Sequence, residues 1–479
     1  MNKHLCLVFT PIDKIYQDAL THYAPPLGLV ALANYVSVVC PDTKVSILDG
    51  SVTHTMADII SFIEKEKPDI VGQSVQLISY RYALEIARCA RDIGAINVVG
   101  GHHASQLADT IASCQEGLLD FVVVGDGEDA ITGILKNEPI IQIPNLVFAK
   151  SGQIFKTKRS FFDLKNAPPL DYSMIDVAPY QHLLKNSNFN NTKNPVSNYI
   201  RTYSHKGCGN RGESVGCIFC GRSDMGVRFK EPGSFWKDVE GIINPNETNY
   251  VFDVGDDFLY DYNWLATVLS LKPEFRLSIE FGIFGRANRV TQDVAKMLSK
   301  LNVSDVVIGF ESGDEEVLRK CNKRDTTPET NISAAKLLFS NGIDVCASFV
   351  LGLPGETKES LRNTVRCAKK IVELANELLG RPPREMVANL IEPSPGSTAY
   401  RKIAKKFPEK YSSSDRISLE ELQKDYFRVY FNLETPQAYD EFRTTLAGYS
   451  NEIHSLVSFS DSQGWIDKEL SMRVARTKV

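Results

Sequence analysis

The sequence contains no uninterrupted apolar stretch of about 18 residues, the length that a membrane-spanning helix needs. It also lacks an excess of positive charge, because 59 Asp and Glu residues outnumber 54 Lys and Arg residues and the net charge is −5. A nucleic-acid partner is therefore not expected. No repeat recurs at a fixed short period, and the opening MNKHLCLVFTPID is too soon interrupted for a signal peptide. We expect a cytoplasmic protein with no membrane partner.

A disulfide framework is also missing, because ten cysteines are spread over 479 residues without an export signal. Seven of them stand alone, most in apolar segments such as LCLVF around Cys6 and VCASFV around Cys346, and we expect these to be buried as small hydrophobic side chains. The other three, Cys208, Cys217 and Cys220, are close together in the sequence and are candidates for chemistry.

The chain does contain two successive alternations of strands and helices, in a composition of 43% hydrophobic and 24% charged residues that is typical of globular proteins. The first alternation fills residues 1–145 and predicts an α/β domain with a doubly wound, Rossmann- or flavodoxin-like parallel sheet. Its strands are expected at residues 3–9, 44–50, 69–76, 96–105 and from 119 onward.

The remainder of the chain divides into three parts. Residues 146–198 are rich in Pro and Asn and predict a linker, which ends in a polar surface loop at 186–198. The second alternation, at 199–380, predicts a full or partial (β/α) barrel. Residues 381–479 predict a mainly helical C-terminal region.

Special residues follow the predicted strands of the first domain, at the sheet edge where doubly wound folds bind ligands. They are Ser74, Gln76, Gly100, Gly101, His102, Gly125, Asp126, Gly127 and Glu128. Taken singly, each is explained by a tight turn, and GDGE alone reads as a turn followed by an acidic helix start. Three such loops on one edge together predict a large flat or phosphate-bearing ligand.

The clustered cysteines occur in GCGNRGESVGCIFCGR, after a predicted strand at the mouth of the barrel. Three thiolates leave one iron of a 4Fe–4S cubane without a protein ligand, and an open coordination position can bind a small molecule. The alternatives are a zinc site completed by His205 or by the remote Cys321, and inert thiols.

GCIFCGR, with Phe219 between the last two cysteines, resembles the cluster loop of radical S-adenosylmethionine (radical SAM) enzymes. Segments farther along the chain resemble the same family in order and spacing: VGDDF (254–258), FGIFGRANRVT (281–291), IGFESGDEEVLRKCNK (308–323) and FVLGLPGET (349–357). The resemblance implies that Gly255, Asp256 and Asp257 receive the methionine ammonium group of S-adenosylmethionine.

For the later segments, the resemblance implies that Arg286 pairs with the methionine carboxylate or with the substrate. Glu311 and Ser312 would accept hydrogen bonds from the ribose, and Leu353 would lie in the adenine-contacting segment. For each segment alone, a barrel loop without a ligand is an alternative.

The first domain resembles the cobalamin-binding domain that precedes the barrel in one radical SAM subclass. The matching segments are PPLGLVALANYV with Pro26 and Gly28, VGQSVQ, VVGGHHAS and VVVGDGEDAI. That resemblance implies a cobalamin without a histidine ligand below its cobalt. The pair His102 and His103 leaves a ligand role open, but we favour a loop role for His102.

The sequence departs from the family in the spacing of the cysteines. The family has three residues in the first gap and two in the second, whereas eight residues, GNRGESVG, separate Cys208 from Cys217. The polar, Gly-rich insert favours a local bulge that still presents three sulfurs, and a displaced cluster loop is the alternative.

Together these resemblances imply an enzyme that cleaves S-adenosylmethionine at a 4Fe–4S cluster to a 5′-deoxyadenosyl radical. Methylation of an unactivated carbon through methylcobalamin is the first expectation. The substrate is expected to be a small molecule such as a natural-product intermediate, and the electron donor a flavodoxin or ferredoxin. The alternatives are cyclisation, rearrangement, dehydration or elimination with a vestigial cobalamin domain, and a non-catalytic corrinoid-binding or redox-sensing protein.

Overall fold

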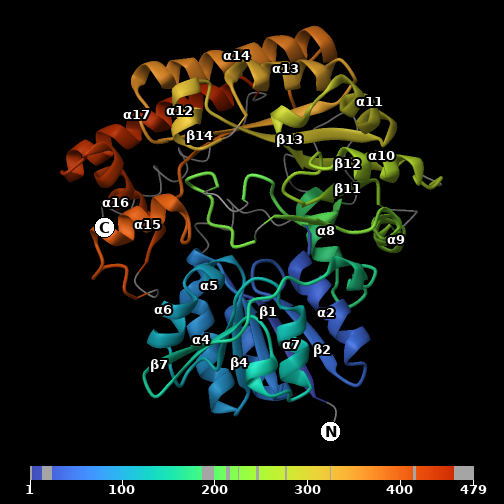
Figure 1. Ribbon diagram of the computed structural model, residues 1–479, viewed down its shortest axis with the longest axis vertical. Helices are drawn as coiled ribbons and strands as arrows, with labels where there is room; N and C mark the ends of the chain where they lie inside the picture. The colour runs from blue at the N-terminus through green and yellow to red at the C-terminus, as the bar shows by residue number, and fades with distance from the viewer. Residues whose placement is uncertain are drawn as a thin grey trace.

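The structure is a computed structural model that describes residues 3–12, 24–185, 199–211, 216–224, 226–243, 248–275, 278–323, 325–413 and 417–457. Figure 1 shows two α/β bodies, an N-terminal one in blue to teal and a second one in green to orange, with loop segments of the middle of the chain between them. The surface loop expected at 186–198 lies outside the described residues. No helix in the described part is both long and apolar enough to cross a membrane.

Within the described residues, the N-terminal sheet has seven strands in the order β2-β1-β3-β4-β5-β6-β7. The parallel strands are β1 (His4–Phe9), β2 (Lys44–Asp49), β3 (Ile70–Ser74), β4 (Ile96–Gly100) and β5 (Phe121–Val123). The connecting helices are α2 (Leu27–Val39), α3 (Met56–Glu66), η1 (Leu77–Ser79), α4 (Tyr80–Asp92), α5 (His102–Gln106), α6 (Ala108–Cys114), α7 (Glu128–Leu135) and η2 (Ile140–Gln142).

Alternate residues of β1 enter two different apolar cores, because successive side chains of a strand point to opposite faces. Leu5 and Leu7 belong to the large core that includes α2 and α7. Cys6 and Val8 belong to a smaller core with residues of α3 and α4. The sheet is therefore covered by helices on both faces, which confirms the expected doubly wound architecture.

The predicted linker is not irregular throughout. It begins with β6 (Leu146–Lys150) and β7 (Gln153–Lys156), an antiparallel pair that extends the N-terminal sheet beyond β5. After η3 (Leu164–Asn166), the chain is held against α2, because the Asn34 Nδ2 donates to the Asp171 carbonyl at 2.9 Å. The segment continues into α8 (Ala178–Lys185). The expected boundary at residue 145 therefore cuts through one continuous sheet.

The second sheet has six strands within the described residues, in the order β15-β14-β13-β12-β11-β8, with every neighbouring pair parallel. The strands are β8 (Tyr199–Thr202), β11 (Tyr250–Asp253), β12 (Glu280–Gly285), β13 (Val303–Glu311), β14 (Asp344–Leu351) and β15 (Met386–Leu390). A separate antiparallel hairpin is formed by β9 (His205–Gly207) and β10 (Val227–Phe229). Of the two expected forms, a full or a partial (β/α) barrel, the structure has the partial one.

The helices of the barrel begin where a short polar side chain accepts a hydrogen bond from the backbone of the first turn. Asp261, Thr291 and Thr357 cap α10, α11 and α14 in this way. The barrel helices are α9 (Pro232–Ile242), α10 (Tyr262–Ser270), η5 (Ala287–Arg289), α11 (Gln292–Lys300), α12 (Glu315–Lys320), α13 (Pro328–Phe339) and α14 (Lys358–Leu379).

The C-terminal region is mainly helical, as expected, with α15 (Thr398–Lys406), α16 (Leu419–Phe431) and α17 (Pro436–Ser455). Its first element, β15, instead completes the edge of the barrel sheet. Ser450 of α17 donates to the Ala388 carbonyl of β15 at 2.6 Å, so this helix is fixed to that edge. Figure 1 shows α15 and α16 beside the barrel, extending toward the N-terminal domain.

Candidate functional site

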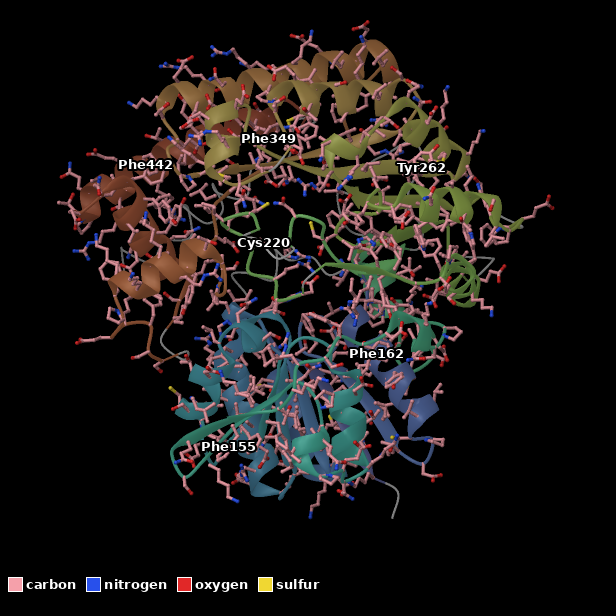
Figure 2. The ribbon with its side chains drawn as sticks, in the orientation of Figure 1. Phe155, Phe162, Cys220, Tyr262, Phe349 and Phe442 are labelled. Atoms are coloured by element: carbon pink, nitrogen blue, oxygen red, sulfur yellow. The ribbon has the colours of Figure 1, made fainter. Side chains whose placement is uncertain are left out.

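The three clustered cysteines lie between β9 and β10, and Figure 2 places Cys220 between the two domains. All three cysteines are partly exposed residues. Ile218 fixes the segment from both sides, because its N–H donates to the Cys321 carbonyl at 3.1 Å and its carbonyl accepts from Ala399 N at 2.9 Å. The neighbouring Phe219 packs against the apolar core. The eight-residue gap therefore does not move the cysteines away from the barrel mouth.

Two glycines allow close packing around the cysteines. A Cβ atom on Gly209, next to Cys208, would overlap the ring of Tyr260. A Cβ on Gly221, next to Cys220, would lie 2.5 Å from the Pro395 carbonyl oxygen. Any larger residue would push the segment away from the barrel loop or from the C-terminal region, which explains glycine at both positions.

His205 is not available as a zinc ligand. Its Nε2 accepts the Asp257 N–H at 3.0 Å, and its Nδ1 lies 2.8 Å from Ser204 Oγ. Burial lowers the pKa of this histidine to about 4, so the ring is neutral with its proton on Nδ1. The Ser204 hydroxyl in turn donates to Asp253 Oδ1 at 3.0 Å. His205 is therefore a structural support for the turn at residues 254–257.

Cys321, the other residue that could complete the alternative zinc site, is fully buried. No group of three or more His, Cys, Asp or Glu side chains in the described part of the chain is gathered closely enough to hold a single metal ion. Thiolates around a cubane bind different irons and stand farther apart than ligands around one ion, so the arrangement is compatible with a cluster. Among the described residues, no zinc site completed by His205 or Cys321 is formed.

Position 255 has room only for glycine, because a Cβ atom there would overlap the ring of His205. The two aspartates that follow have different environments. Asp256 is committed to Arg211, and its other oxygen lies 3.4 Å from Arg222. Asp257 is fully buried, and neither of its oxygens accepts a well-formed hydrogen bond from a described residue. The Leu259 N–H is near enough to lower the pKa of Asp257 but makes no hydrogen bond of good geometry to it. A buried carboxylate with so few donors is costly unless a ligand satisfies it, so Asp257 is the better candidate for an ammonium.

Asp257 lies among charged groups of the barrel. Burial raises its pKa to about 6, although the positive charges of Arg286, Arg289 and Lys323 lower it. Arg286 itself is buried at the end of β12 and lies near this carboxylate. A carboxylate and a guanidinium at one barrel mouth can receive the ammonium and the carboxylate of one amino acid.

Glu311 lies in the left-handed region, with φ of 60°, at the end of β13. Its Oε1 accepts from Lys323 Nζ at 2.6 Å. Burial raises the pKa of the nearby Cys217, while Lys323 lowers it and Glu311 raises it. Ser312 is fully buried and lies 3.3 Å from the Thr364 hydroxyl of α14. Leu353 is fully buried in the apolar core. Direct contacts of these residues with ribose and adenine stay predictions.

At the edge of the first domain, some expected ligand residues have local structural explanations. Gly101 has φ of 91°, and a Cβ there would lie 3.1 Å from the backbone of Val75. Gly125 has φ of 87°, and its N–H donates to Ser105 Oγ at 2.9 Å. Gly28 differs, because it is exposed in the first turn of α2 and a Cβ would meet nothing within 4 Å. Among the described residues, nothing therefore fills the space beside the start of α2.

The other expected residues of this edge lie at element ends. Pro26 caps α2, and its carbonyl accepts from Val30 N at 3.1 Å. Ser74 and Gly100 end β3 and β4, and Gln76 precedes η1. Gly127 caps α7.

His102 begins α5 and is not in a loop as expected. His102 is exposed to solvent, while neighbouring protein atoms and then Arg222 on the cysteine segment lower its pKa to about 4. The imidazole is therefore neutral at neutral pH and lies near the cysteine segment of the other domain. His103 is buried beside Tyr80 at a ring separation of 5.2 Å, within its own domain.

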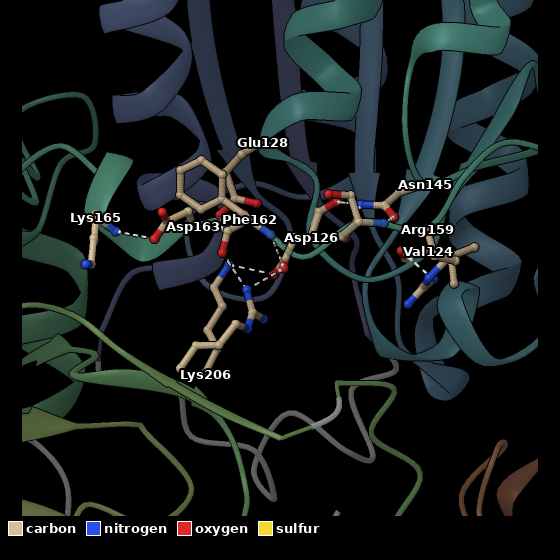
Figure 3. A network of polar contacts seen from close by, with 11 residues as sticks. Val124, Asp126, Glu128, Asn145, Arg159, Phe162, Asp163, Lys165 and Lys206 are labelled. Atoms are coloured by element: carbon tan, nitrogen blue, oxygen red, sulfur yellow. Dashed lines mark hydrogen bonds and ion pairs between the residues drawn. The ribbon is translucent and has the colours of Figure 1, made fainter. Parts of the chain in front are cut away.

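Four charged side chains join the domains next to the cysteines, and we call them the interdomain ion cluster: Asp126, Glu128, Lys206 and Arg228. Lys206 Nζ lies 2.9 Å from Asp126 Oδ1 and 2.8 Å from Glu128 Oε1 (Figure 3). Arg228 Nη1 lies 3.0 Å from Asp126 Oδ2. Lys206 stands two residues before Cys208. Glu128, expected to bind cofactor, is thus paired with the other domain.

The residues that sequence reasoning missed act through contacts between distant segments. His205 was weighed only as a metal ligand, and Lys206, Arg228 and Lys323 carry no motif. Asn210 and Arg211 were part of an insert interpreted as a bulge, and their polar character was the only available signal.

Taken together, the residues fit the groups that the sequence implies. Partly exposed thiols on one fixed segment suit a cluster, and the buried, unsatisfied Asp257 suits an ammonium. At the facing edge of the first domain, Gly28 and His102 are both exposed among the described residues, which leaves surface there for a large ligand.

Comparison with known proteins identifies both domains. Residues 203–368 match the radical SAM superfamily, and residues 14–135 match the B12 binding domain. An uncharacterized methyltransferase of Pyrococcus horikoshii is 26% identical over 387 residues, covering 77% of this chain and 78% of the relative. An anaerobic magnesium-protoporphyrin IX monomethyl ester cyclase of Cereibacter sphaeroides is 24% identical, covering 68% of this chain but 54% of its own length.

A hopanoid C-3 methylase of Methylococcus capsulatus is 23% identical, covering 74% of this chain and 66% of its own. Among solved structures, the cobalamin-dependent S-adenosylmethionine radical enzyme OxsB shares the fold with a TM-score of 0.70 at 15% identity, covering 95% of this chain and 72% of its own. With a radical SAM domain, a B12 binding domain and this shared fold, the chain belongs to the cobalamin-binding radical S-adenosylmethionine enzymes.

Proposed function

We propose that this enzyme methylates an unactivated carbon of a small molecule, with cobalamin and S-adenosylmethionine as its cofactors. The observation that carries the proposal is that the cysteine segment meets both domains. Arg211 pairs with Asp256 in the barrel, and Arg222 is close enough to His102 of the B12 binding domain to lower its pKa. When bound, the cluster supplies the electron that cleaves S-adenosylmethionine, and the cobalamin supplies the methyl group.

The chain's own residues have separate roles in this proposal. Cys208, Cys217 and Cys220 hold the cluster and leave one iron open for S-adenosylmethionine. Asp257 accepts hydrogen bonds from the methionine ammonium, and Arg286 pairs with its carboxylate. His205 orients Asp257 by accepting its N–H, so the carboxylate is positioned before the ligand arrives.

The B12 binding domain and the barrel act on one reaction only if the two domains keep a fixed relation. The interdomain ion cluster supplies this link, because its side chains are between 7% and 28% exposed and pair directly across the boundary. The ten free cysteines fit a reducing compartment such as the cytoplasm, where a flavodoxin or ferredoxin is the proposed electron donor.

The test uses anaerobically reconstituted protein with bound cobalamin, incubated with methyl-labelled S-adenosylmethionine, a reductant and an extract of small molecules. The proposal expects 5′-deoxyadenosine together with label in an extracted product at a position resistant to hydrolysis. Formation of 5′-deoxyadenosine without label in any product would contradict methyl transfer and favour the cyclase-type alternative, which the relative in Cereibacter sphaeroides supports. A Cys217→Ala variant is the matched control and is expected to yield neither.

A further inference from the structure

The long gap between Cys208 and Cys217 places two side-chain donors on the sulfurs of the cysteines that follow it. Asn210 Nδ2 donates to Cys217 Sγ at 3.1 Å. Arg211 Nη1 donates to Cys220 Sγ at 3.4 Å. Both donors belong to the insert that departs from the family spacing, and both reach forward along the chain to sulfurs seven and nine residues away.

The Asn210 side chain is held in place by its other contacts. It is 3% exposed, and the same Nδ2 also donates to the Asn322 carbonyl at 3.0 Å. Asn322 in turn donates from its own Nδ2 to the Gly216 carbonyl at 3.0 Å, so the two asparagines join the insert to the segment after α12. The N–H is therefore directed at Cys217 Sγ by a fixed frame.

Arg211 is fixed in a similar way. Its Nη2 donates to Asp224 Oδ2 at 2.9 Å and also to Asp256, while its backbone N–H donates to the Cys208 carbonyl at 2.9 Å. Two carboxylates offset the single positive charge of the guanidinium. Arg211 therefore acts on Cys220 Sγ mainly through the dipole of its N–H group, since its net charge is offset.

Hydrogen bonds to cysteine sulfurs change the reduction potential of an iron–sulfur cluster. Reduction adds negative charge, which spreads onto the sulfurs, so an N–H donor stabilises the reduced state more than the oxidised state. We propose that Asn210 and Arg211 are positioning residues that donate hydrogen bonds to two cluster sulfurs and thereby raise the reduction potential of this enzyme's cluster. The inference rests on the proposed function, because it requires Cys208, Cys217 and Cys220 to hold a cluster.

The test is a redox titration of anaerobically reconstituted full-length protein, followed by electron paramagnetic resonance, with iron and sulfide measured on each sample. The variants are Asn210→Leu, which removes the donor at similar volume, and Arg211→Met. The matched control is Asn322→Ala, which removes the side-chain bond to the Gly216 carbonyl but keeps the backbone carbonyl that accepts from Asn210, so the donor on Cys217 stays in place. We expect the midpoint potential to move to more negative values in both variants and to stay at the wild-type value in the control.

Unchanged potentials in both variants at wild-type iron content would overturn the inference, and so would an equal shift in Asn322→Ala. Should Asn210→Leu fail to fold, Asn210→Asp replaces the donor by an acceptor of the same shape, and its potential must fall below that of the wild type. A wild-type protein that binds no cluster would overturn the proposed function as well, so the two failures are distinguishable.

Discussion

Replacing Lys206 by methionine removes the central charge of the interdomain ion cluster at nearly constant volume. Asp126 keeps Arg228 as its partner at 3.0 Å, whereas Glu128, whose side chain is 7% exposed, loses Lys206. Burial alone would lower the pKa of Lys206, but Glu128 and Asp126 raise it, so the lysine is charged in the wild type. The variant therefore leaves one nearly buried carboxylate without its partner.

Removing one partner of a fully buried ion pair costs about 3–5 kcal/mol. Lys206 is 28% exposed, and water can partly solvate the remaining carboxylate, so we expect a loss of about 2 kcal/mol in the free energy of unfolding. The double variant Lys206→Met with Glu128→Gln removes the unpaired charge and is expected to recover about 1 kcal/mol. Denaturant unfolding of the wild type, both single variants and the double variant completes the cycle.

The same variants test whether the interdomain ion cluster keeps the two domains in the relation that catalysis needs. Lys206→Met is expected to weaken cobalamin retention, while the cysteine segment still binds iron. The solvent-exposed pair of Lys156 and Asp109, within the first domain, offers a matched control, since Lys156→Met is expected to cost less than about 0.5 kcal/mol. Additive losses in the cycle, or an equal loss in Lys156→Met, would refute this reasoning.

Three further predictions follow from buried groups. S-adenosylmethionine binding is expected to weaken as the pH falls below about 6, the pKa of Asp257. Asp257→Asn should bind roughly tenfold to a hundredfold more weakly and without that pH dependence. Calorimetric titration at several pH values checks both, and a persistent pH dependence in the variant would contradict the assignment. Burial raises the pKa of Asp253 to about 7. Its contribution to stability is therefore largest below the pKa of about 3.9 in the unfolded chain, and it declines by up to ~1.4 kcal/mol per pH unit as the pH rises to 7. Asp253→Asn should flatten this slope in unfolding measurements, and an unchanged slope would contradict the role given to Asp253. Gly255→Ala is expected to lose S-adenosylmethionine binding because its Cβ would overlap the His205 ring. Gly94→Ala, at a left-handed glycine whose Cβ would meet no described atom within 4 Å, should retain binding.

The periodic parts of the fold could be predicted from the sequence, because apolar alternation and turn residues are local signals. Strands β1 to β5 of the first domain and β8, β11, β12, β13 and β14 of the barrel follow from such patterns. The hairpin of β6 and β7 was assigned to a linker, because a Pro-rich flank conceals strands that are stabilised only by pairing with β5. Strand β15 was missed for the same reason, since its partner β14 is distant in the sequence.

In the candidate site too, local patterns predicted some residues and could not predict others. Cys208, Cys217 and Cys220 and the VGDDF turn were found because their residue types and order carry a family pattern. The difference between Asp256 and Asp257 could not be found, because it depends on Arg211 approaching one carboxylate and burial isolating the other. The pairing of Glu128 with Lys206 likewise depends on the contact between domains, which no local pattern encodes.

The most direct test of the central claim is the metal content of anaerobically purified, reconstituted protein with hydroxocobalamin supplied during expression. Iron, sulfide, cobalt and zinc are measured per chain in the wild type and in a variant with Cys208, Cys217 and Cys220 all changed to alanine. The account predicts about four irons with matching sulfide and stoichiometric cobalt in the wild type, and loss of the iron but not of the cobalt in the variant. Zinc alone, or iron that persists without the three cysteines, would contradict it.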